Sequence, residues 1–404
     1  MANIFTSKSP FFLDGGTGTH MIAAGFPEGA CMEQWILEHP DVFQNLQREY
    51  VKAGSNAVFA PTFGANRAKL SSYGLGDKVD EINQKLVSLS REAVGNDILV
   101  GADLSTTGLF IPPYGDTSFD EIYDIYREQI ESLVRAGVDF IGIETALNLW
   151  EPRAAAMICR ELDIPFFASI TVDQSGHTLM GTTLAPCVVC LQAMGASAVG
   201  INCSNGPVGL EEQFRQASKY AKIPLSAKPN AGLPDDSKPS GFDLTVEEFA
   251  DGMKVLAESG ASILGGCCGT GPAHIAAIQN IKPTLPDVSQ LDCLANEKRV
   301  FVLPKAPVIS QPITCGWELE DDLLDLEDTG TDIACVVISS EEDCQTLAEA
   351  ASSSPVAIAI SCSDSKLLDK ALMLYQGRAA VMKDCIEDSA ALITIAEKYG
   401  AVIL

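Results

Sequence analysis

Residues 131–146 read ESLVRAGVDFIGIETA, in which a helical segment ends in glycine and a run of apolar, β-favouring residues begins almost at once. Glycine after a helix fits a left-handed C-terminal cap, and a nearly continuous apolar strand is typical of a parallel strand covered on both faces. The same pattern recurs at LQREYVKAGSNAVFAPTF (46–63), LQAMGASAVGINCS (191–204) and AESGASILGGCC (257–268). The repeating unit is therefore a helix followed by a buried parallel strand.

Further apolar runs complete a set of eight predicted strands, namely PFFLDGG (10–16), ILVGADLS (98–105), PFFASITV (165–172) and IPLSAKPN (223–230). Most intervals between neighbouring strands leave room for a crossover helix and a loop. Eight such units before residue 286 match the size of a TIM barrel. The sequence thus predicts an α/β fold with a (β/α)8 barrel at residues 1–285, and a doubly wound open sheet is the alternative.

The rest of the chain differs in composition. Residues 281–312 contain five prolines and little periodicity, and we interpret residues 286–315 as a linker. Residues 286–404 carry 21 acidic and 8 basic residues, a net charge of −13. Four more predicted strands follow the linker, namely ACVVISS (334–340), VAIAISC (356–362), AAVMKD (379–384) and GAVIL (400–404). The sequence therefore predicts a small acidic βα domain at residues 316–404.

Composition and charge restrict the function. A net charge of −27 disfavours nucleic acid and anionic membranes as partners. The N-terminus has no charged leader followed by a long apolar run, and no stretch of the chain is apolar enough for a membrane span. The 13 cysteines are spread irregularly, which favours reduced thiols and metal ligation over a disulfide framework. We expect a soluble cytoplasmic protein.

Polar residues at the C-terminal ends of the predicted strands mark the expected active site, because barrel enzymes place their reactive groups there. These residues are Asp14, Thr62, Glu144, Cys203, Asn230, Cys267 and Cys268. The adjacent pair Cys267 and Cys268 follows the eighth strand, and Cys203 ends the sixth, so three thiolates are expected to face one metal ion. Such a site with an open fourth position suits catalytic zinc, which accepts a substrate thiol.

Cysteine is also a common small buried residue, and packing is the alternative role for each of these thiols. Glycines on both sides of the adjacent pair, and a third cysteine at another strand end, favour the metal site. For Cys187 and Cys190, which lie in an apolar helical run, we expect packing.

Six motifs, in order, resemble those of the homocysteine S-methyltransferase family: LDGGTGTH (13–20), APTFGAN (60–66), GIETALN (142–148), GINCSNGP (200–207), AKPNAGLP (227–234) and GGCCGTGPAHI (265–275). Their spacing is most similar to the homocysteine-binding barrel of the cobalamin-dependent methionine synthases. The resemblance covers about residues 10–285. It implies a zinc-dependent enzyme that methylates the thiolate of L-homocysteine to L-methionine.

The resemblance implies a role for each matching residue. Zinc would bind to Cys203, Cys267 and Cys268, the substrate ammonium would contact Asp14 and Glu144, and its carboxylate would meet the backbone of Gly15 and Gly16. Thr62, Asn66 and Asn230 match positions that line the same pocket. Independently, an amino-acid substrate needs carboxylates for its ammonium and backbone N–H donors for its carboxylate.

The C-terminal segment from about residue 355 resembles part of the pterin-binding barrel that follows in those synthases. It departs from that family at Ser361–Ser363, where the family has Asp-Ser-Ser, and at Met382, where the family has Asn. Half of that barrel is also absent. We therefore do not expect this segment to bind methyltetrahydrofolate.

The methyl donor is the open question. The chain has no cobalamin-binding Asp-x-His-x-x-Gly loop, so the donor is expected to be a separate molecule. The resemblance favours a methylated corrinoid protein, which would bring cobalamin only indirectly, and a small donor such as S-methylmethionine is the alternative. Gly64 lies where betaine-using relatives carry Tyr, which disfavours betaine. A non-catalytic zinc or amino-acid binding subunit is the alternative from another class of function.

Overall fold

The computed structural model describes residues 3–6, 9–112, 114–238, 241–285, 287–383, 386 and 388–404. Pro286, where the predicted linker begins, and Asp384, the last residue of the predicted strand AAVMKD, lie outside the described residues. None of the helices in these ranges combines the length and the hydropathy needed to cross a bilayer.

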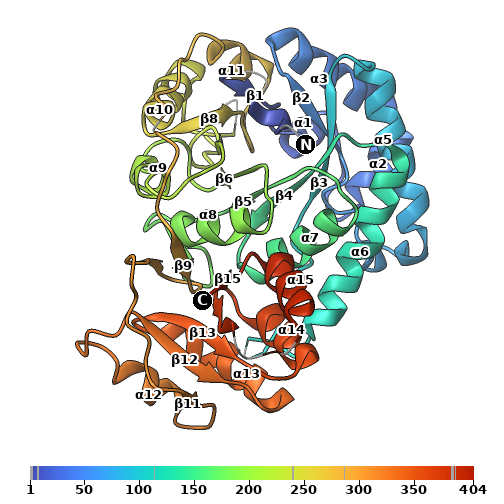
Figure 1. The fold of residues 1–404 in the computed structure, drawn as a ribbon. Coiled ribbons are helices and arrows are strands. Elements are labelled where there is room, and N and C mark those ends of the chain that lie inside the picture. The colour runs from blue at the N-terminus through green and yellow to red at the C-terminus, as the bar shows by residue number, and fades with distance from the viewer. Residues whose placement is uncertain are drawn as a thin grey trace.

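Eight parallel strands form the larger sheet, with the order β1-β8-β7-β6-β5-β4-β3-β2. Because the first strand pairs with the eighth, the sheet curls into a nearly closed barrel, and helices surround it (Figure 1). The strands are β1 (Phe11–Phe12), β2 (Ala57–Ala60), β3 (Leu99–Leu104), β4 (Phe140–Ala146), β5 (Phe166–Ile170), β6 (Ala198–Cys203), β7 (Leu225–Pro229) and β8 (Ala261–Leu264). The predicted (β/α)8 barrel is confirmed, and the open-sheet alternative is wrong.

The helices of this part follow the strands in alternation. They are η1 (Ile4–Thr6), α1 (Gly18–Ala23), α2 (Met32–Glu38), α3 (Pro40–Ala53), α4 (Arg67–Ser71), η2 (Gly76–Lys78), α5 (Val79–Val94), α6 (Phe119–Ala136), α7 (Trp150–Glu161), α8 (Leu184–Ala193), α9 (Glu211–Ser218), α10 (Val246–Glu258) and α11 (Pro272–Ala277). The glycine caps read from the sequence occur at Gly54 and Gly137, which end α3 and α6 in the left-handed conformation.

Aromatic rings fill the inside of the barrel. Phe5 of η1 packs edge-on against Phe11, Phe140 and Phe167, with ring centroids 5.2 to 5.9 Å apart. Phe59 of β2 adds a fifth ring 5.5 Å from Phe140. The barrel centre is therefore a packed core, and the open space for a substrate lies at the ends of the strands.

Side chains bridge the seam between β1 and β2, the two ends of the sheet order. The backbone N–H of Asn56 donates to the carbonyl of Phe12 at 2.7 Å, and the Asn56 side-chain oxygen accepts from the Phe12 N–H at 2.9 Å. Asp14 accepts a hydrogen bond of 2.8 Å from the Phe59 N–H in β2. One carboxylate oxygen of Asp14 therefore has a structural role in the seam.

The C-terminal part forms a second, five-stranded parallel sheet, with the order β11-β12-β13-β14-β15. Its elements are β11 (Ile313–Thr314), α12 (Leu319–Leu324), β12 (Ile333–Val337), α13 (Glu341–Ala350), η3 (Ala351–Ser353), β13 (Ala357–Ser361), α14 (Ser365–Leu374), β14 (Ala380–Val381), α15 (Ser389–Tyr399) and β15 (Val402–Ile403). The four predicted strands are present as β12 to β15, and β11 is an additional one.

Three strands, β11 and two more, lie within residues 286–315, where the sequence indicated only a linker. Strands β9 (Cys293–Ala295) and β10 (Val300–Val302) pair antiparallel. Residue 295 also bonds to Arg378 of the C-terminal sheet region in both directions, at 3.0 and 2.8 Å. The segment is therefore an ordered hairpin against which the C-terminal part packs.

The C-terminal part is bound closely to the barrel helices α7 and α8. The guanidinium of Arg153, only 1% exposed, donates to the carbonyls of Leu372 and Met373 at the end of α14, at 2.8 and 3.0 Å. The Tyr375 hydroxyl donates to the carbonyl of Ala295 at 3.0 Å. Cys190 of α8 is fully buried and contacts the Gly377 carbonyl, in keeping with a packing role.

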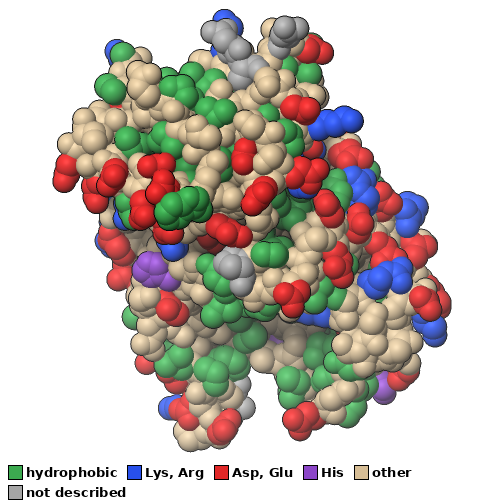
Figure 2. Space-filling view, turned by 90° about the horizontal axis from the view of Figure 1, so that it is seen from below, with side chains coloured by type: hydrophobic (Ala, Val, Ile, Leu, Met, Phe, Trp, Pro, Cys, Tyr) green, Lys and Arg blue, Asp and Glu red, His purple; other side chains and the backbone are tan. Residues whose placement is uncertain are grey.

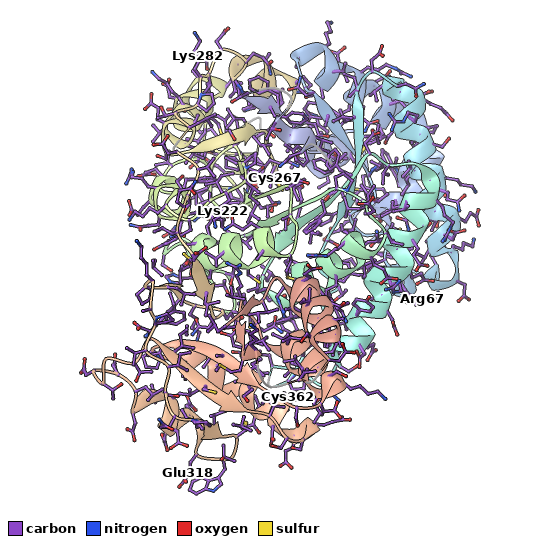
Figure 3. The ribbon with its side chains drawn as sticks, in the orientation of Figure 1. Arg67, Lys222, Cys267, Lys282, Glu318 and Cys362 are labelled. Carbon is purple, nitrogen blue, oxygen red and sulfur yellow. The ribbon has the colours of Figure 1, made fainter. Side chains whose placement is uncertain are left out.

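Acidic side chains outnumber basic ones in the C-terminal part. Figure 2 views the molecule from this side and shows Asp and Glu gathered more densely than Lys and Arg. The seven acids of the stretch Glu318–Asp328 are all exposed, next to Trp317, which is 89% exposed. Figure 3 places Glu318 at the end of the molecule farthest from Cys267.

Candidate metal and substrate site

A cavity of about 720 Å³ opens at the C-terminal ends of the barrel strands. Its described lining includes Asp14, Gly15, Gly16, Glu144, Cys203, Cys267 and Cys268 from the set selected in the sequence. Figure 3 shows Cys267 inside the ring of barrel elements. The barrel therefore brings seven of the ten selected residues to one cavity.

Three thiols meet in this cavity. Cys203 ends β6, and Cys267 and Cys268 follow β8 after two glycines. The three sulfur atoms lie within 4.8 Å of one another, and the sulfurs of Cys203 and Cys268 are 4.0 Å apart. Two thiolates on a tetrahedral zinc ion lie about 3.8 Å apart, given Zn–S bonds of about 2.3 Å. The three side chains could thus hold a metal ion with little movement.

The backbone beside the thiols adopts an unusual conformation. Cys203, Ser204 and Thr145 have φ values of 58°, 60° and 60°, in the left-handed region that non-glycine residues rarely occupy. The Asn202 side chain braces these strand ends, because its oxygen accepts from the Thr145 N–H at 2.7 Å and its nitrogen donates to the Thr145 hydroxyl at 2.9 Å. The Asn202 side-chain nitrogen also lies 3.9 Å from the Cys267 sulfur. The strand ends are therefore held so that Cys203 faces its partners.

The closeness of the thiols changes their acidity. Hydrogen bonds from Cys203 and Cys267 lower the pKa of Cys268 to about 3. Hydrogen bonds with Cys267 and Cys268 raise the pKa of Cys203 well above that of an ordinary thiol. One sulfur of the group is therefore readily a thiolate, the form that binds soft metal ions.

The glycine loop after β1 packs directly on the cysteine loop. A Cβ atom on Gly16 would lie 2.6 Å from the Cys267 carbonyl oxygen, so only glycine fits there. The Gly16 N–H donates to the carbonyl and hydroxyl oxygens of Thr270, at 3.2 and 3.1 Å. The Gly16 amide is therefore engaged within the protein, which leaves the expected contact of Gly15 and Gly16 with a substrate carboxylate as a prediction.

A buried lysine lies between the two carboxylates selected in the sequence. The ammonium of Lys228, on β7, is 2.7 Å from Glu144, 3.9 Å from Asp14 and 4.0 Å from the centre of the Phe59 ring. Burial alone would lower the pKa of Lys228, but Glu144, Asp14 and Asp103 together raise it above its ordinary value. Lys228 is therefore a fixed positive charge within the acidic end of the cavity.

Asp103, on β3, is a third carboxylate lining this end of the cavity. Its Oδ1 atom is buried and has no hydrogen-bond partner among the described residues. Burial raises the pKa of Asp103, and the nearby charge of Glu144 raises it further. Burial likewise raises the pKa of Asp14 to about 7, although Lys228 and the Phe59 N–H act to lower it. Because three carboxylates lie near the single ammonium of Lys228, this end of the cavity favours the binding of a second cation.

Three of the site residues expected from the sequence do not line the cavity and make structural contacts within the protein. Thr62 bonds the backbone of Asp103 between neighbouring strands, Asn66 caps α4 by accepting from the Lys69 N–H, and Asn230 donates to the Ser204 carbonyl. None of Thr62, Asn66 and Asn230 is among the described residues that line the cavity. Their expected contact with the substrate stays a prediction.

The outer part of the cavity is mainly apolar and holds one lysine and one glutamate, Lys69 and Glu33. Phe63, Tyr73 and Lys69 line it, with the Lys69 ammonium 5.0 Å from the centre of the Phe63 ring. Glu33 accepts a 2.7 Å hydrogen bond from the Gly64 N–H, and a Cβ atom on Gly64 would lie 2.6 Å from the Glu33 carboxylate. A larger side chain at residue 64 would displace Glu33.

Sequence reasoning missed Asp103, Lys228 and Asn202. Asp103 and Lys228 are charged residues near the C-terminal ends of otherwise apolar predicted strands, the position that selected Glu144. The sequence does not indicate the hydrogen bonds of Asn202, because its partner Thr145 lies 57 residues earlier in the chain.

Comparison with known proteins gives consistent matches. The sequence model described as homocysteine S-methyltransferase matches residues 11–281. Methionine synthase of Mycobacterium tuberculosis (strain ATCC 25618 / H37Rv) is 34% identical over an aligned length of 295, and the match covers 67% of this chain and 24% of that protein. Methionine synthase of Mycobacterium leprae (strain TN) is 32% identical over an aligned length of 263, and the match covers 61% of this chain and 22% of that protein. The matched part of this chain thus spans about a quarter of the length of these relatives.

Among solved structures, the metallated form of the homocysteine methyltransferase MmuM from Escherichia coli has a similar fold. It matches with a TM-score of 0.57 and 23% sequence identity, over 69% of this chain and 98% of that chain.

Proposed function

Because the chain belongs to the homocysteine S-methyltransferase family, we propose that it transfers a methyl group to the sulfur of L-homocysteine and forms L-methionine, with zinc as its metal. The observation that carries this proposal is that three cysteine sulfurs converge in a cavity that is also lined by the carboxylates of Asp14, Asp103 and Glu144. A thiol-binding end and an ammonium-binding end are what a thiol amino acid needs.

The donor set suits zinc. Three sulfur ligands from Cys203, Cys267 and Cys268 leave one tetrahedral position open, the arrangement of catalytic zinc sites. When bound, zinc supplies a positive charge that keeps a substrate thiol deprotonated near neutral pH. The Asn202 brace and the left-handed backbone at Cys203 hold the ligands in place without further ordering.

The acidic wall positions the amino-acid end of the substrate. Lys228 uses one oxygen of Glu144, and the Phe59 N–H uses one oxygen of Asp14. The unpartnered Oδ1 of Asp103 and the excess of carboxylates over Lys228 favour a substrate ammonium at this point. Burial raises the pKa of Glu144, and the nearby Lys228 ammonium acts against this shift and so favours the ionised form that attracts a substrate ammonium.

Methyl transfer then needs orientation and a dry cavity. The electron pair of the substrate sulfur forms the new S–C bond while the donor's leaving group departs with the pair of the old bond. The apolar outer part of the cavity excludes water from this step and aligns the two reactants.

The volume of the cavity leaves space beyond homocysteine for a methyl donor. We propose a separate methylated corrinoid protein as the donor, because the sequence relatives are methionine synthases. A small donor such as S-methylmethionine is the second candidate, since the rings of Phe63 and Tyr73 in the outer wall would attract a methylated cation. The irregular spacing of the cysteines along the chain favours reduced thiols, in agreement with a reducing compartment such as the cytoplasm.

A donor screen tests the proposal. Purified zinc-loaded protein is incubated with homocysteine and either a methylated corrinoid protein, methylcobalamin, S-methylmethionine or betaine, and methionine is measured by mass spectrometry. We expect methionine from one of these donors and none from a Cys267→Ala variant with the same donor. If no donor gives methionine while homocysteine still binds, the chain is a binding subunit and the enzymatic proposal is wrong.

A further inference from the structure

Two lysines are the cations among the described residues that line the cavity of the three cysteines. Lys228 lies 2.7 Å from Glu144 and 3.9 Å from Asp14, so its charge is balanced within the protein. Lys69 of α4 also lines the cavity, and its ammonium forms no ion pair within the part of the chain that the structure describes. Lys69 is therefore the cation that is available to a ligand.

The ammonium of Lys69 is held at the cavity wall. It donates to the Ser105 hydroxyl at 2.7 Å and lies 5.0 Å from the centre of the Phe63 ring. Ser105 is only 1% exposed, and its hydroxyl donates in turn to the Phe63 carbonyl. An ammonium carries three N–H donors, and the described residues accept from one of them. The remaining N–H groups are free to donate to a bound molecule.

Burial makes this unpaired charge costly. Lys69 is half-buried, and burial lowers its pKa, although the charges of Glu33, Glu151 and Asp103 act in the opposite direction. An anion that accepts hydrogen bonds from a partly buried ammonium stabilises it. Glu33 lines the same part of the cavity, but its carboxylate already accepts from the Gly64 N–H at 2.7 Å. The position of Lys69 therefore favours an anionic group on a ligand.

Lys69 is also held near the carboxylate of Asp103. Ser105, which accepts from Lys69, follows Asp103 by two residues at the end of β3, and the charge of Asp103 acts on the pKa of Lys69. Asp103 belongs to the carboxylates of the cavity that favour a substrate ammonium. The wall thus offers neighbouring partners to the ammonium and the carboxylate of an α-amino acid, which are themselves neighbours.

Two other groups of the cavity are less suited to a ligand carboxylate. The Gly16 N–H, an expected contact, donates to the carbonyl and hydroxyl oxygens of Thr270. Lys228 lies among three carboxylates, which would repel a fourth. Lys69 has neither of these disadvantages.

We propose that Lys69 binds the carboxylate of an amino acid held in this cavity. Under the proposed function, on which this assignment rests, the carboxylate belongs either to homocysteine or to a methylated amino acid that serves as the donor. In both cases Lys69 donates a charge-assisted hydrogen bond to a carboxylate oxygen, and the cavity selects amino acids over amines that lack a carboxylate.

Calorimetric titration of the full zinc-loaded chain with two thiols tests the first source. Homocysteine is compared with 3-mercaptopropylamine, which has the same thiol and amine but no carboxylate. If homocysteine supplies the carboxylate, Lys69→Met weakens homocysteine binding about tenfold and leaves the binding of 3-mercaptopropylamine unchanged. Lys69→Arg, which keeps the charge, is expected to restore part of the affinity.

Two sulfonium compounds test the second source in the same way, namely S-methylmethionine and its analogue without the carboxylate, (3-aminopropyl)dimethylsulfonium. If the donor supplies the carboxylate, Lys69→Met leaves homocysteine binding unchanged, weakens S-methylmethionine binding about tenfold and does not alter the binding of the analogue. The matched control Lys254→Met removes an exposed lysine of α10 outside the cavity and is expected to bind all these compounds like the wild type. Zinc content of every variant serves as the check on folding.

The assignment is overturned if Lys69→Met binds both amino acids like the wild type. It is also overturned if Lys69→Met loses as much affinity for the compounds without a carboxylate, because Lys69 would then be structural. A wild type that holds zinc but binds neither amino acid would contradict the proposed function itself, and the assignment with it.

Discussion

The three cysteine sulfurs come from β6 and from the loop after β8, two strands separated by β7 in the sheet. Their convergence depends on barrel closure and not on neighbouring positions in the chain. The thiols contribute little to the packing that forms the barrel. Metal binding and folding are therefore separable at this site.

Replacing Cys203, Cys267 or Cys268 singly with Ala is expected to lower bound zinc from about one per chain to less than about a tenth, because a two-thiolate site loses a strong ligand. Zinc is measured by plasma mass spectrometry, and the fold is checked by circular dichroism. Cys315→Ala is the control, because Cys315 is a half-buried thiol in the C-terminal part. Full zinc content in a Cys267 and Cys268 double variant would show that the metal lies elsewhere.

Glu144→Gln is expected to weaken homocysteine binding about tenfold to a hundredfold while zinc content stays the same. The substitution removes the charge that attracts the substrate ammonium but keeps an oxygen that accepts from Lys228. Calorimetric titration with homocysteine measures the change. Glu258→Gln, at the exposed end of α10, is the control. Unchanged affinity in Glu144→Gln would assign Glu144 a structural role with Lys228.

At the scale of the elements, the repeated helix, glycine and strand pattern predicted four of the barrel strands, and further apolar runs predicted the other four. Each strand is a long apolar run because helices and core cover both of its faces. The sequence did not predict strands β9 and β10, because each has only three residues and the turn between them, Asn296–Arg299, is polar. The sequence did not predict that Lys228 and Asp103 lie near Glu144, because these residues are far apart in the chain.

The β9–β10 hairpin carries Glu297 and allows a test of its burial. The pKa of Glu297 is raised from 4.5 to about 7, so its contribution to stability is complete below pH 4.5 and is lost as the pH rises to 7. Glu297→Gln is therefore expected to be more stable than the wild type at about pH 8, by up to about 3 kcal/mol, with little difference near pH 4.5.

Urea unfolding across this pH range measures the difference in free energy of unfolding. Glu342→Gln is the exposed control and is expected to follow the wild type. A pH-independent difference for Glu297→Gln would mean that Glu297 is not a buried, strained carboxylate.

At the scale of the whole molecule, the barrel and the C-terminal part share one hydrophobic core. The largest cluster of buried apolar residues runs from barrel residues such as Trp150 to C-terminal ones such as Val336 and Tyr399. Arg153 fixes this junction from the barrel side. The two parts are therefore expected to unfold together, in a single calorimetric transition.

Arg153→Met is expected to lower the free energy of unfolding by about 3 kcal/mol and to split the transition in two, because it leaves two helix-end carbonyls without their charged donor. Differential scanning calorimetry detects the split. Arg160→Met, on the exposed end of α7, is the control. One unchanged transition in Arg153→Met would show that apolar packing alone holds the junction. This point variant is a cleaner test than deletion of residues 316–404, which would also expose α7.

The central claim is that three cysteine thiolates hold a zinc ion with a position open to the substrate thiol. Zinc K-edge X-ray absorption of the purified protein, with and without homocysteine, tests it most directly. The account predicts three sulfur ligands at about 2.3 Å and one lighter ligand in the free protein, and four sulfurs with saturating homocysteine. A sulfur count that stays at three with homocysteine bound, or is lower than three without it, would contradict the account.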